Sequence, residues 1–251
     1  MSATSMTTSF LNNFMSQNWE DLVMAHYPAE PDSVQSSLPE DLLVDTYGDQ
    51  AWFSVVAFRL TDLSIRPITC LRWNDFWEIN LRTYVRDMKG NKGVWFYSLD
   101  SSDLLGVMGA RLLYGLPYNF ARIHRAGSPE DRKIVYHGIR GKIADCRIEA
   151  DWKDEQNIES VPGTIDHFLL ERYRFWSRRR LAGSSSSACV RHVPYEAYRL
   201  DDIQYEGGLF ASQGLNEPDH VPVLGHYCPG FYVEATAPEW AFSISGQANQ
   251  R

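Results

Sequence analysis

A strictly alternating segment, followed by a turn and a return segment, constrains the fold of this chain more than any other feature. From 78 to 86 polar and apolar side chains take turns, as in a β-strand whose successive side chains point to opposite faces. The polar positions are Glu78, Asn80, Arg82 and Tyr84. A turn at 87–93 reverses the chain, and the return segment 94–99 has no solvent-like face. Because paired strands share their two faces, the polar face of the first strand is expected to look into a covered space.

Further segments have the composition of strands, which makes the predicted fold class mainly β with a few short helices. Segment 51–58 is apolar on both faces, as in a central strand, and 42–46 with 51–60 is expected to form a hairpin. Three consecutive segments predict a β-meander: 118–124, 133–140 and 143–152. Other extended segments are expected at 171–178, 189–193, 195–205 and 223–235, and a hairpin loop at the serine run 183–187.

Local periodicity and capping residues predict the helices. Apolar residues at mixed three- and four-residue intervals indicate one or two short amphipathic helices between Phe10 and Tyr27. Ser101 or Ser102 is expected to cap a longer helix over 103–114, which Gly115 ends. Two shorter helices are expected, one after Asp32 and one at 165–170.

Composition limits the partners and the compartment. A formal net charge of -8 argues against a nucleic-acid partner, and no apolar run approaches the roughly 20 residues that a membrane helix needs. The first nine residues lack the pattern of a signal peptide, and the four cysteines are spaced as reduced core thiols, so a cytoplasmic protein is expected. No phosphate-loop, dinucleotide, zinc-protease or serine-hydrolase motif is present, and no cofactor or metal is expected. A homo-oligomer remains open.

No linker divides the sequence. The expected organisation is a flexible N-terminus over 1–9, one domain over 10–244 and a flexible C-terminal tail over 245–251.

Several strings distributed over most of the chain resemble the YqjF-like family of bacterial proteins, a family without an established function. The strings are Trp19-x-x-Leu22 with His26-Tyr27, Leu38-Pro39 before Asp45, Glu78-x-Asn80-x-Arg82-Thr83-Tyr84-Val85, Trp95-Phe96-x-Ser98-Leu99-Asp100, Ala110-Arg111 with Leu116-Pro117-Tyr118, and Glu171-Arg172-Tyr173. That family is in turn similar, more distantly, to the acetoacetate decarboxylase superfamily. The resemblance implies a curved, largely antiparallel β cone or barrel around an interior cavity.

The same resemblance assigns site residues. Glu78 matches the cavity glutamate of the superfamily, whereas Tyr118 and Asn119 stand where a pair of lysines carries the Schiff-base chemistry. None of the five lysines of this chain is an obvious replacement, so decarboxylation through a Schiff base is not expected.

Six residues are therefore candidates for a working site. Glu78 is expected to take or give a proton and Tyr118 to donate a hydrogen bond to a ligand oxygen. The ligand-binding candidates are Asn80, Arg82, Arg111 and Asn119, with Arg82 and Arg111 as anchors for a carboxylate. The alternative for Glu78 and Arg82 is a structural ion pair inside the barrel, and His26, His192 and the segment 171–173 are assigned to packing or structure.

Three functions follow. The first is binding of a small, carboxylated metabolite in an interior polar cavity. The second is a lyase, hydratase or isomerase that needs no lysine and uses Glu78 as acid and base. The third is a structural or interaction protein whose barrel is filled by side chains.

Overall fold

β-Strands dominate the computed structural model, which describes residues 14–66, 73, 75–153, 157–178 and 185–238. The strands are β1 (Met15–Ala29), β2 (Leu42–Val44), β3 (Ala51–Ile65), β4 (Phe76–Asp87), β5 (Lys92–Ser101), β6 (Tyr118–Phe120), β7 (Arg122–Ser128), β8 (Lys133–Arg140), β9 (Ala144–Asp151), β10 (Asn157–Ile158), β11 (Arg174–Arg178), β12 (Ser185–Arg191), β13 (Ala197–Arg199), β14 (Asp202–Gly207) and β15 (Leu224–Ala235). The helices are α2 (Pro31–Ser37), α3 (Leu104–Tyr114) and α4 (Ile165–Leu170), and a 3-10 turn, η1, spans Ala211–Gln213.

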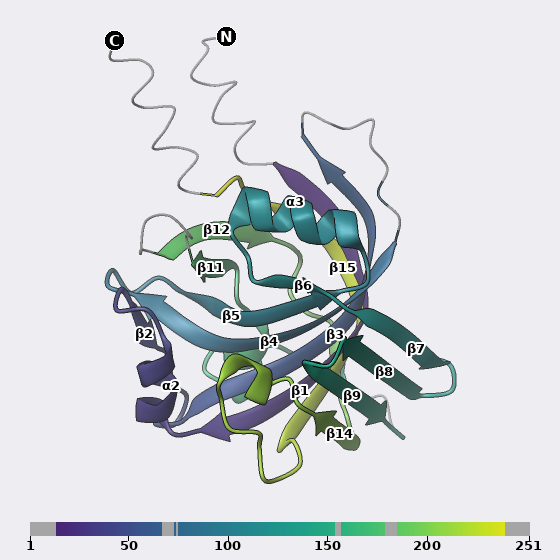
Figure 1. Cartoon of the computed structure of the whole chain (residues 1–251). Helices are drawn as coiled ribbons and strands as arrows, with labels where there is room; N and C mark the ends of the chain where they lie inside the picture. The colour runs from purple at the N-terminus through teal and green to yellow at the C-terminus, as the bar shows by residue number, and fades with distance from the viewer. Residues whose placement is uncertain (1–13, 67–72, 74, 154–156, 179–184, 239–251) are drawn as a thin grey trace.

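The larger of the two sheets closes on itself. Its strands follow one another in the order β1, β3, β4, β5, β11, β12 and β15, and β15 pairs again with β1 from Met15↔Ala235 to His26↔Leu224. Every neighbouring pair in this ring is antiparallel except β5 with β11. Figure 1 shows the strands curving into a ring, with α3 lying across one end beside β6. The predicted mainly β fold class, a curved cone of largely antiparallel strands, is confirmed.

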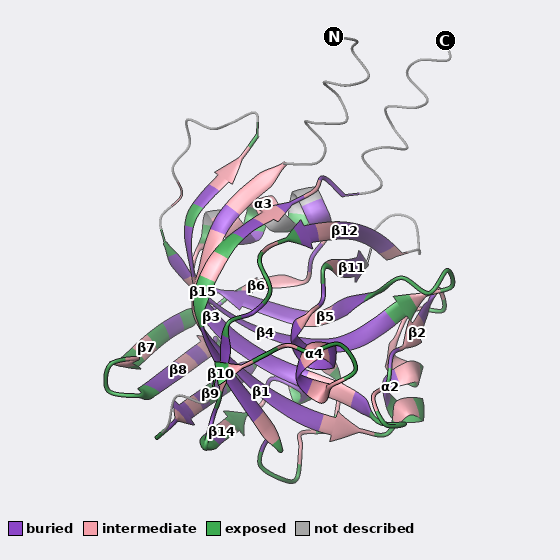
Figure 2. Ribbon diagram, turned by 180° about the vertical axis from the view of Figure 1, so that it is seen from behind, coloured by how far each residue is buried: buried purple, intermediate pink, exposed green. Residues whose placement is uncertain are grey.

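A second, four-stranded sheet in the order β14, β9, β8 and β7 covers the outside of the ring. Val55, Ala57 and Ile79 of the ring pack in one core with Ile134 and Tyr136 of the small sheet. The alternate residues of β3 and β4 therefore face the interior of the ring, which leaves these strands buried on both sides (Figure 2).

Register shifts change which residues face that interior. One shift falls between Glu20 and Val23, beside Asp21 with φ of 53°, and another lies opposite Asp62 with φ of 52°. A third separates Leu81 from Arg82 in the pairing of β4 with β5, where Tyr97 is the extra residue. Because of this last shift, Phe96 faces the interior on one side of the bulge and Leu99 faces it on the other.

The helices predicted between Phe10 and Tyr27 are wrong, because β1 runs through most of this segment and 10–13 lies outside the described residues. β1 pairs with both β3 and β15, so its residues 22–25 are buried without alternation. The bulge at Asp21 interrupts the two-residue period further. A strand that is buried on both faces and interrupted by a bulge thus places its apolar residues at the mixed three- and four-residue intervals that are typical of a helix.

The predicted hairpin of 42–46 with 51–60 has the correct strands but the wrong partner. β2 pairs with the far end of β4, at Leu42↔Asp87, and β3 pairs with β1 and β4 as a central strand. Likewise 195–205 is not one extended segment: it divides into β13 in the large sheet and β14 in the small sheet. The serines 185–187, expected in a loop, begin β12.

The predicted hairpin of β4 with β5 and helix α3 are confirmed. The predicted meander forms as β7, β8 and β9, but its expected first segment, 118–124, divides into β6, which pairs with β5 in the large sheet, and β7, which continues to Ser128. The cap of α3 is Asp103, whose carboxylate accepts from Gly106 N, and not Ser101 or Ser102. Gly115 ends the helix with φ of 66°, a left-handed conformation that glycine adopts without steric cost.

Cys146 and Cys228 are buried free thiols and Cys189 is a half-buried one, as expected of reduced cysteines. Cys70 and the predicted flexible ends 1–9 and 245–251 lie outside the described residues. In the part of the chain that the structure describes, none of the helices has the length and apolar character to cross a membrane.

Candidate functional site

The interior face of β4 carries the polar residues that the alternation of the sequence singled out. Glu78, Asn80 and Arg82 are 2%, 3% and 6% exposed, opposite Phe58, Val56 and Ser54 of β3. The expectation that this face is covered is confirmed, because the closed ring of strands surrounds it.

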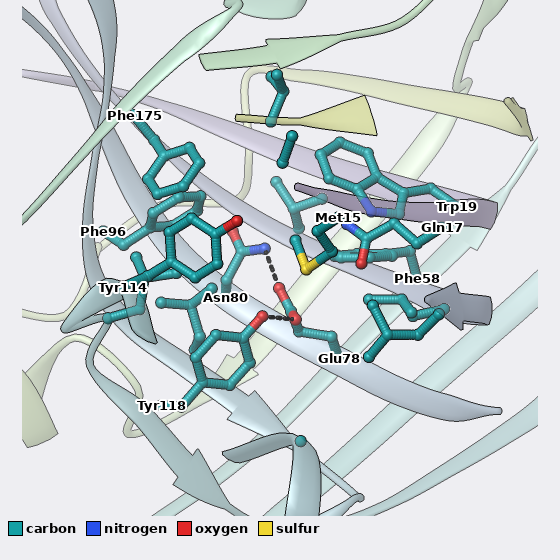
Figure 3. A pocket seen from close by; sticks show the side chains of 18 of the residues that line it. Met15, Gln17, Trp19, Phe58, Glu78, Asn80, Phe96, Tyr114, Tyr118 and Phe175 are labelled. Carbon is teal, nitrogen blue, oxygen red and sulfur yellow. Dashed lines mark hydrogen bonds between the residues drawn. The ribbon is translucent and has the colours of Figure 1, made fainter. Parts of the chain in front are cut away.

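Tyr118 approaches Glu78 from the short strand β6. Pro117 and the end of α3 lead the chain into β6, which pairs in parallel with β5 at Leu99↔Tyr118. The Tyr118 hydroxyl donates to Glu78 Oε2 at 2.6 Å, and Asn80 Nδ2 donates to Glu78 Oε1 at 3.1 Å (Figure 3). Both oxygens of Glu78 are thus held by hydrogen-bond donors of the site.

Burial dominates the acid-base behaviour of this group. Loss of water raises the pKa of Glu78 from 4.5 to about 7, although the bonds from Tyr118 and Asn80 favour the charged form. Burial, reinforced by the neighbouring Glu78 carboxylate, raises the pKa of Tyr118 well above its ordinary value. Near neutral pH Glu78 can therefore exchange a proton, while Tyr118 remains a donor.

Arg82 is a buried cation without a carboxylate partner among the described residues. Its Nη2 donates to Leu169 O across a long 3.4 Å, and its guanidinium lies 5.9 Å from the Tyr84 ring. Its Nε has no hydrogen-bond partner in the described part of the chain. Arg82 and Glu78 do not form the closed ion pair of the structural alternative. A buried guanidinium with free donors is suited to bind an anion.

A pocket inside the ring brings Glu78, Asn80, Arg82 and Tyr118 together. Its cavity has a volume of about 110 Å³. Most of its lining is aliphatic or aromatic, so the predicted polar cavity is in fact an apolar one with a polar strip along β4. Figure 3 shows Glu78 and Asn80 between a group with Trp19 and Phe58 and a group with Phe96 and Phe175.

Two further arginines border the pocket, but each has partners of its own. Arg172 donates to Asp45 at 2.8 Å and to Phe168 O at 2.8 Å. Arg174 donates to Ser187 Oγ at 2.7 Å. The ion pair of Arg172 with Asp45 is consistent with the structural role expected for the segment 171–173, and Arg172 also borders the pocket.

Three buried polar atoms of pocket residues have no hydrogen-bond partner among the described residues. They are Asn80 Oδ1, Arg82 Nε and Trp19 Nε1. Since buried polar groups are normally satisfied, unpaired atoms that gather at one cavity indicate a place for a ligand or for water.

The structure places Arg111 and Asn119 outside the pocket lining. Arg111 is exposed on α3, where it donates to the Tyr118 carbonyl and to Asn119 Oδ1. Asn119 Nδ2 donates in turn to Asp100 Oδ1 at 3.3 Å, beside the buried ion pair of Asp100 with Arg140. Both residues brace the segment that carries Tyr118 and do not reach the cavity.

All five lysines lie within the described residues, and all are exposed. They are Lys89, Lys92, Lys133, Lys142 and Lys153. None of them lines the pocket.

A buried hydrogen-bonded chain behind Arg82 was not predicted. Asp166 Oδ1 meets His226 Nε2 at 2.8 Å, His226 Nδ1 meets His26 Nε2 at 2.9 Å, and His26 Nδ1 meets Ser54 Oγ at 2.7 Å. Ser54 Oγ then meets the Tyr84 hydroxyl at 2.6 Å. Tyr84 is not among the residues that line the pocket. The bond from His226 is the main reason that the pKa of Asp166 falls to about 2.

These partners come from α4, β15, β1, β3 and β4, so no local sequence signal joins them. Within the described ranges no group of three or more His, Cys, Asp or Glu side chains has an arrangement that would hold a metal ion.

Comparison with known proteins adds evolutionary context to this geometry. The model of DUF2071, a family of uncharacterized conserved proteins, matches residues 16–232. The uncharacterized protein YqjF of Bacillus subtilis (strain 168) is 33% identical over 215 residues, which cover 85% of this chain and 86% of the relative.

Solved structures of the same fold are acetoacetate decarboxylase-like. The acetoacetate decarboxylase of Legionella pneumophila aligns with a TM-score of 0.60 at 14% identity, over 90% of this chain and 88% of the other. An acetoacetate decarboxylase-like enzyme of Sphingomonas wittichii RW1 aligns with 0.61 at 14% identity, over 91% and 92%. The enduracididine biosynthesis enzyme MppR, complexed with pyruvate, aligns with 0.56 at 15% identity, over 88% of each chain. These likenesses establish the fold, and the match over most of the sequence establishes that the chain belongs to the DUF2071 family.

Proposed function

We propose that the protein binds a small carboxylated molecule in the pocket inside the ring, with the carboxylate on Arg82. Arg82 carries this proposal, because it is 6% exposed, borders the cavity and has no carboxylate partner among the described residues. Arginine stays protonated even when buried, and a buried charge without a counter-ion costs free energy. A ligand carboxylate that accepts two parallel hydrogen bonds from the guanidinium removes that cost.

Glu78, Asn80 and Tyr118 would hold the remainder of a polar head group. Asn80 Oδ1 is a free acceptor, and Glu78 with a pKa of about 7 can present either a donor or an acceptor. MppR, a protein of the same fold, is known in complex with pyruvate, a small carboxylic acid. That complex supports a carboxylated ligand for this fold.

Schiff-base decarboxylation is not part of the proposal. The exposed positions of all five lysines, together with Tyr118 and Asn119 at the positions of the lysine pair, support binding without an amine nucleophile.

The test compares two arginines of one strand. Arg82→Gln removes the buried cation, whereas Arg86→Gln changes an exposed arginine four residues further along β4. A panel of small carboxylates is expected to raise the melting temperature of the wild type and of Arg86→Gln. Arg82→Gln is expected to lose at least tenfold in affinity, because a charge-assisted bond contributes about 1.5–3 kcal/mol. If Arg82→Gln binds a stabilising carboxylate as well as the wild type does, the assignment is wrong.

The pKa of Glu78 supports a second candidate function, a lysine-independent lyase, hydratase or isomerase. A buried carboxyl group with a pKa of about 7 can take a proton from the carbon beside a carbonyl and return it, with Tyr118 placed to stabilise the developing oxyanion. Such a site is expected to exchange the C3 protons of 2-oxo acids, from pyruvate to 2-oxooctanoate, for deuterium in D₂O. Exchange no faster than in a buffer blank, or unchanged in Glu78→Gln, would contradict this candidate.

A further inference from the structure

The apolar walls of the pocket contribute nothing to the binding of a carboxylate head group. On one side of the polar strip they include Met15, Trp19 and Phe58, and on the other side Phe96 and Phe175 (Figure 3). These side chains come from four different strands of the ring, β1, β3, β5 and β11, so the walls extend over much of the interior. The apolar lining therefore extends well beyond the polar strip that a carboxylate head group would occupy.

The volume of the cavity leads to the same conclusion. One water needs roughly 10–15 Å³ of cavity volume, and the pocket has about 110 Å³. Water in such a space would find few polar partners away from the strip along β4, because most of the lining is aliphatic or aromatic.

Two glycines of α3 line the pocket without a side chain. A Cβ atom at Gly109 would lie 3.9 Å from Trp73 Cη2, an ordinary van der Waals contact. A Cβ atom at Gly106 would lie 3.0 Å from Asp103 Oδ2, the cap of the helix, and 3.6 Å from Phe76 Cζ. At these two positions the helix presents only backbone to the pocket.

We propose that the ligands of the pocket are monocarboxylic acids with an extended apolar body, an inference that rests on the proposed function. The carboxylate binds Arg82, and the body lies between the walls around Phe58 and Phe96. Such a ligand covers apolar surface that a short acid leaves in contact with water. Each methylene that becomes buried is expected to tighten binding about fourfold.

The test is a calorimetric titration of the wild-type protein with the straight-chain acids from acetate to octanoate. The dissociation constant is expected to fall about fourfold for each added methylene until the chain fills the space. Octan-1-ol has the same chain without the carboxylate and is expected to bind at least tenfold more weakly than octanoate.

A matched pair of methionine variants locates the apolar contact. Met15→Gln changes a wall residue into a polar one of similar length, and Met88→Gln makes the same change in the exposed turn after β4. Met15→Gln is expected to weaken octanoate several-fold and to leave acetate unchanged, while Met88→Gln changes neither.

The outcomes separate the two proposals. If acetate binds as tightly as octanoate, the extended apolar body is wrong and the carboxylate site stands. Octan-1-ol that binds as tightly as octanoate would show that the walls bind a ligand while Arg82 does not bind its carboxylate. If no acid of the series binds, the proposed function fails and this inference fails with it. The wild-type series decides even if Met15→Gln does not fold.

Discussion

At the scale of the residue, Glu78 and Arg82 lie on the same face of β4 and neither neutralises the other. Residues four apart on a strand are separated by roughly 13 Å along the chain, which keeps the carboxylate and the guanidinium apart. Glu78 meets the cost of burial by a raised pKa and by bonds from Tyr118 and Asn80. Arg82 has no carboxylate partner within the described residues, and the proposal of a bound carboxylate rests on that observation.

The raised pKa of Glu78 predicts how stability depends on pH. Between pH 4.5 and about 7 the folded protein holds a proton that the unfolded chain has released, so the free energy of unfolding falls as the pH rises. The difference between the two pKa values corresponds to about 3 kcal/mol. Glu78→Gln cannot lose this proton. The free energy of unfolding of the variant, relative to that of the wild type, is therefore expected to be about 3 kcal/mol higher at pH 8 than at pH 4.

Denaturant unfolding at both pH values measures that gain. The amide introduced by Glu78→Gln fits the site, because its oxygen can accept from Tyr118 and the Asn80 amide can turn its free Oδ1 toward the new donor. Glu206→Gln, a change at an exposed glutamate of β14, is the control. A difference between Glu78→Gln and the wild type that is independent of pH would show that Glu78 has no raised pKa.

At the scale of the element, the sequence predicts best where one face of a strand differs from the other. β4 alternates in sequence, so its hairpin with β5 and the direction of Glu78, Asn80 and Arg82 could be predicted. β1 is buried on both faces and bulged at Asp21, and its pattern indicates a helix instead. Pairing partners are a further limit, since β2 joins β4 across about 40 residues of chain and only the folded ring fixes that choice.

The buried chain from Asp166 to Tyr84 shows a similar limit for side chains. His26 has no acid or histidine at a characteristic spacing, so packing was the reasonable prediction for it. In the fold it lies between Ser54 and His226 because β1 pairs with β3 on one side and β15 on the other. Burial lowers the pKa of both histidines, which keeps them neutral as members of a hydrogen-bonded chain.

At the scale of the whole molecule, closure of the ring encloses a strip of polar residues in a cavity. Only the family resemblance could assign Tyr118 to this cavity. Tyr118 lies on β6, which follows helix α3, and it contacts Glu78 because β6 pairs with β5 in the folded protein. The same resemblance suggested Asn119, which faces the ion pair of Asp100 and Arg140 instead. The apolar walls could not be predicted, because they combine side chains of several strands. In these strands the bulges determine which residues face the interior of the ring.

The binding mode proposed for the interior of the ring, an amphipathic acid with its carboxylate on Arg82, is visible in a crystal structure of the protein grown with octanoate. The carboxylate oxygens are expected within hydrogen-bond distance of the Arg82 guanidinium, and the chain is expected between Phe58 and Phe96. Octanoate bound outside the ring, or inside it with its carboxylate directed away from Arg82, would show that the proposed binding mode is wrong.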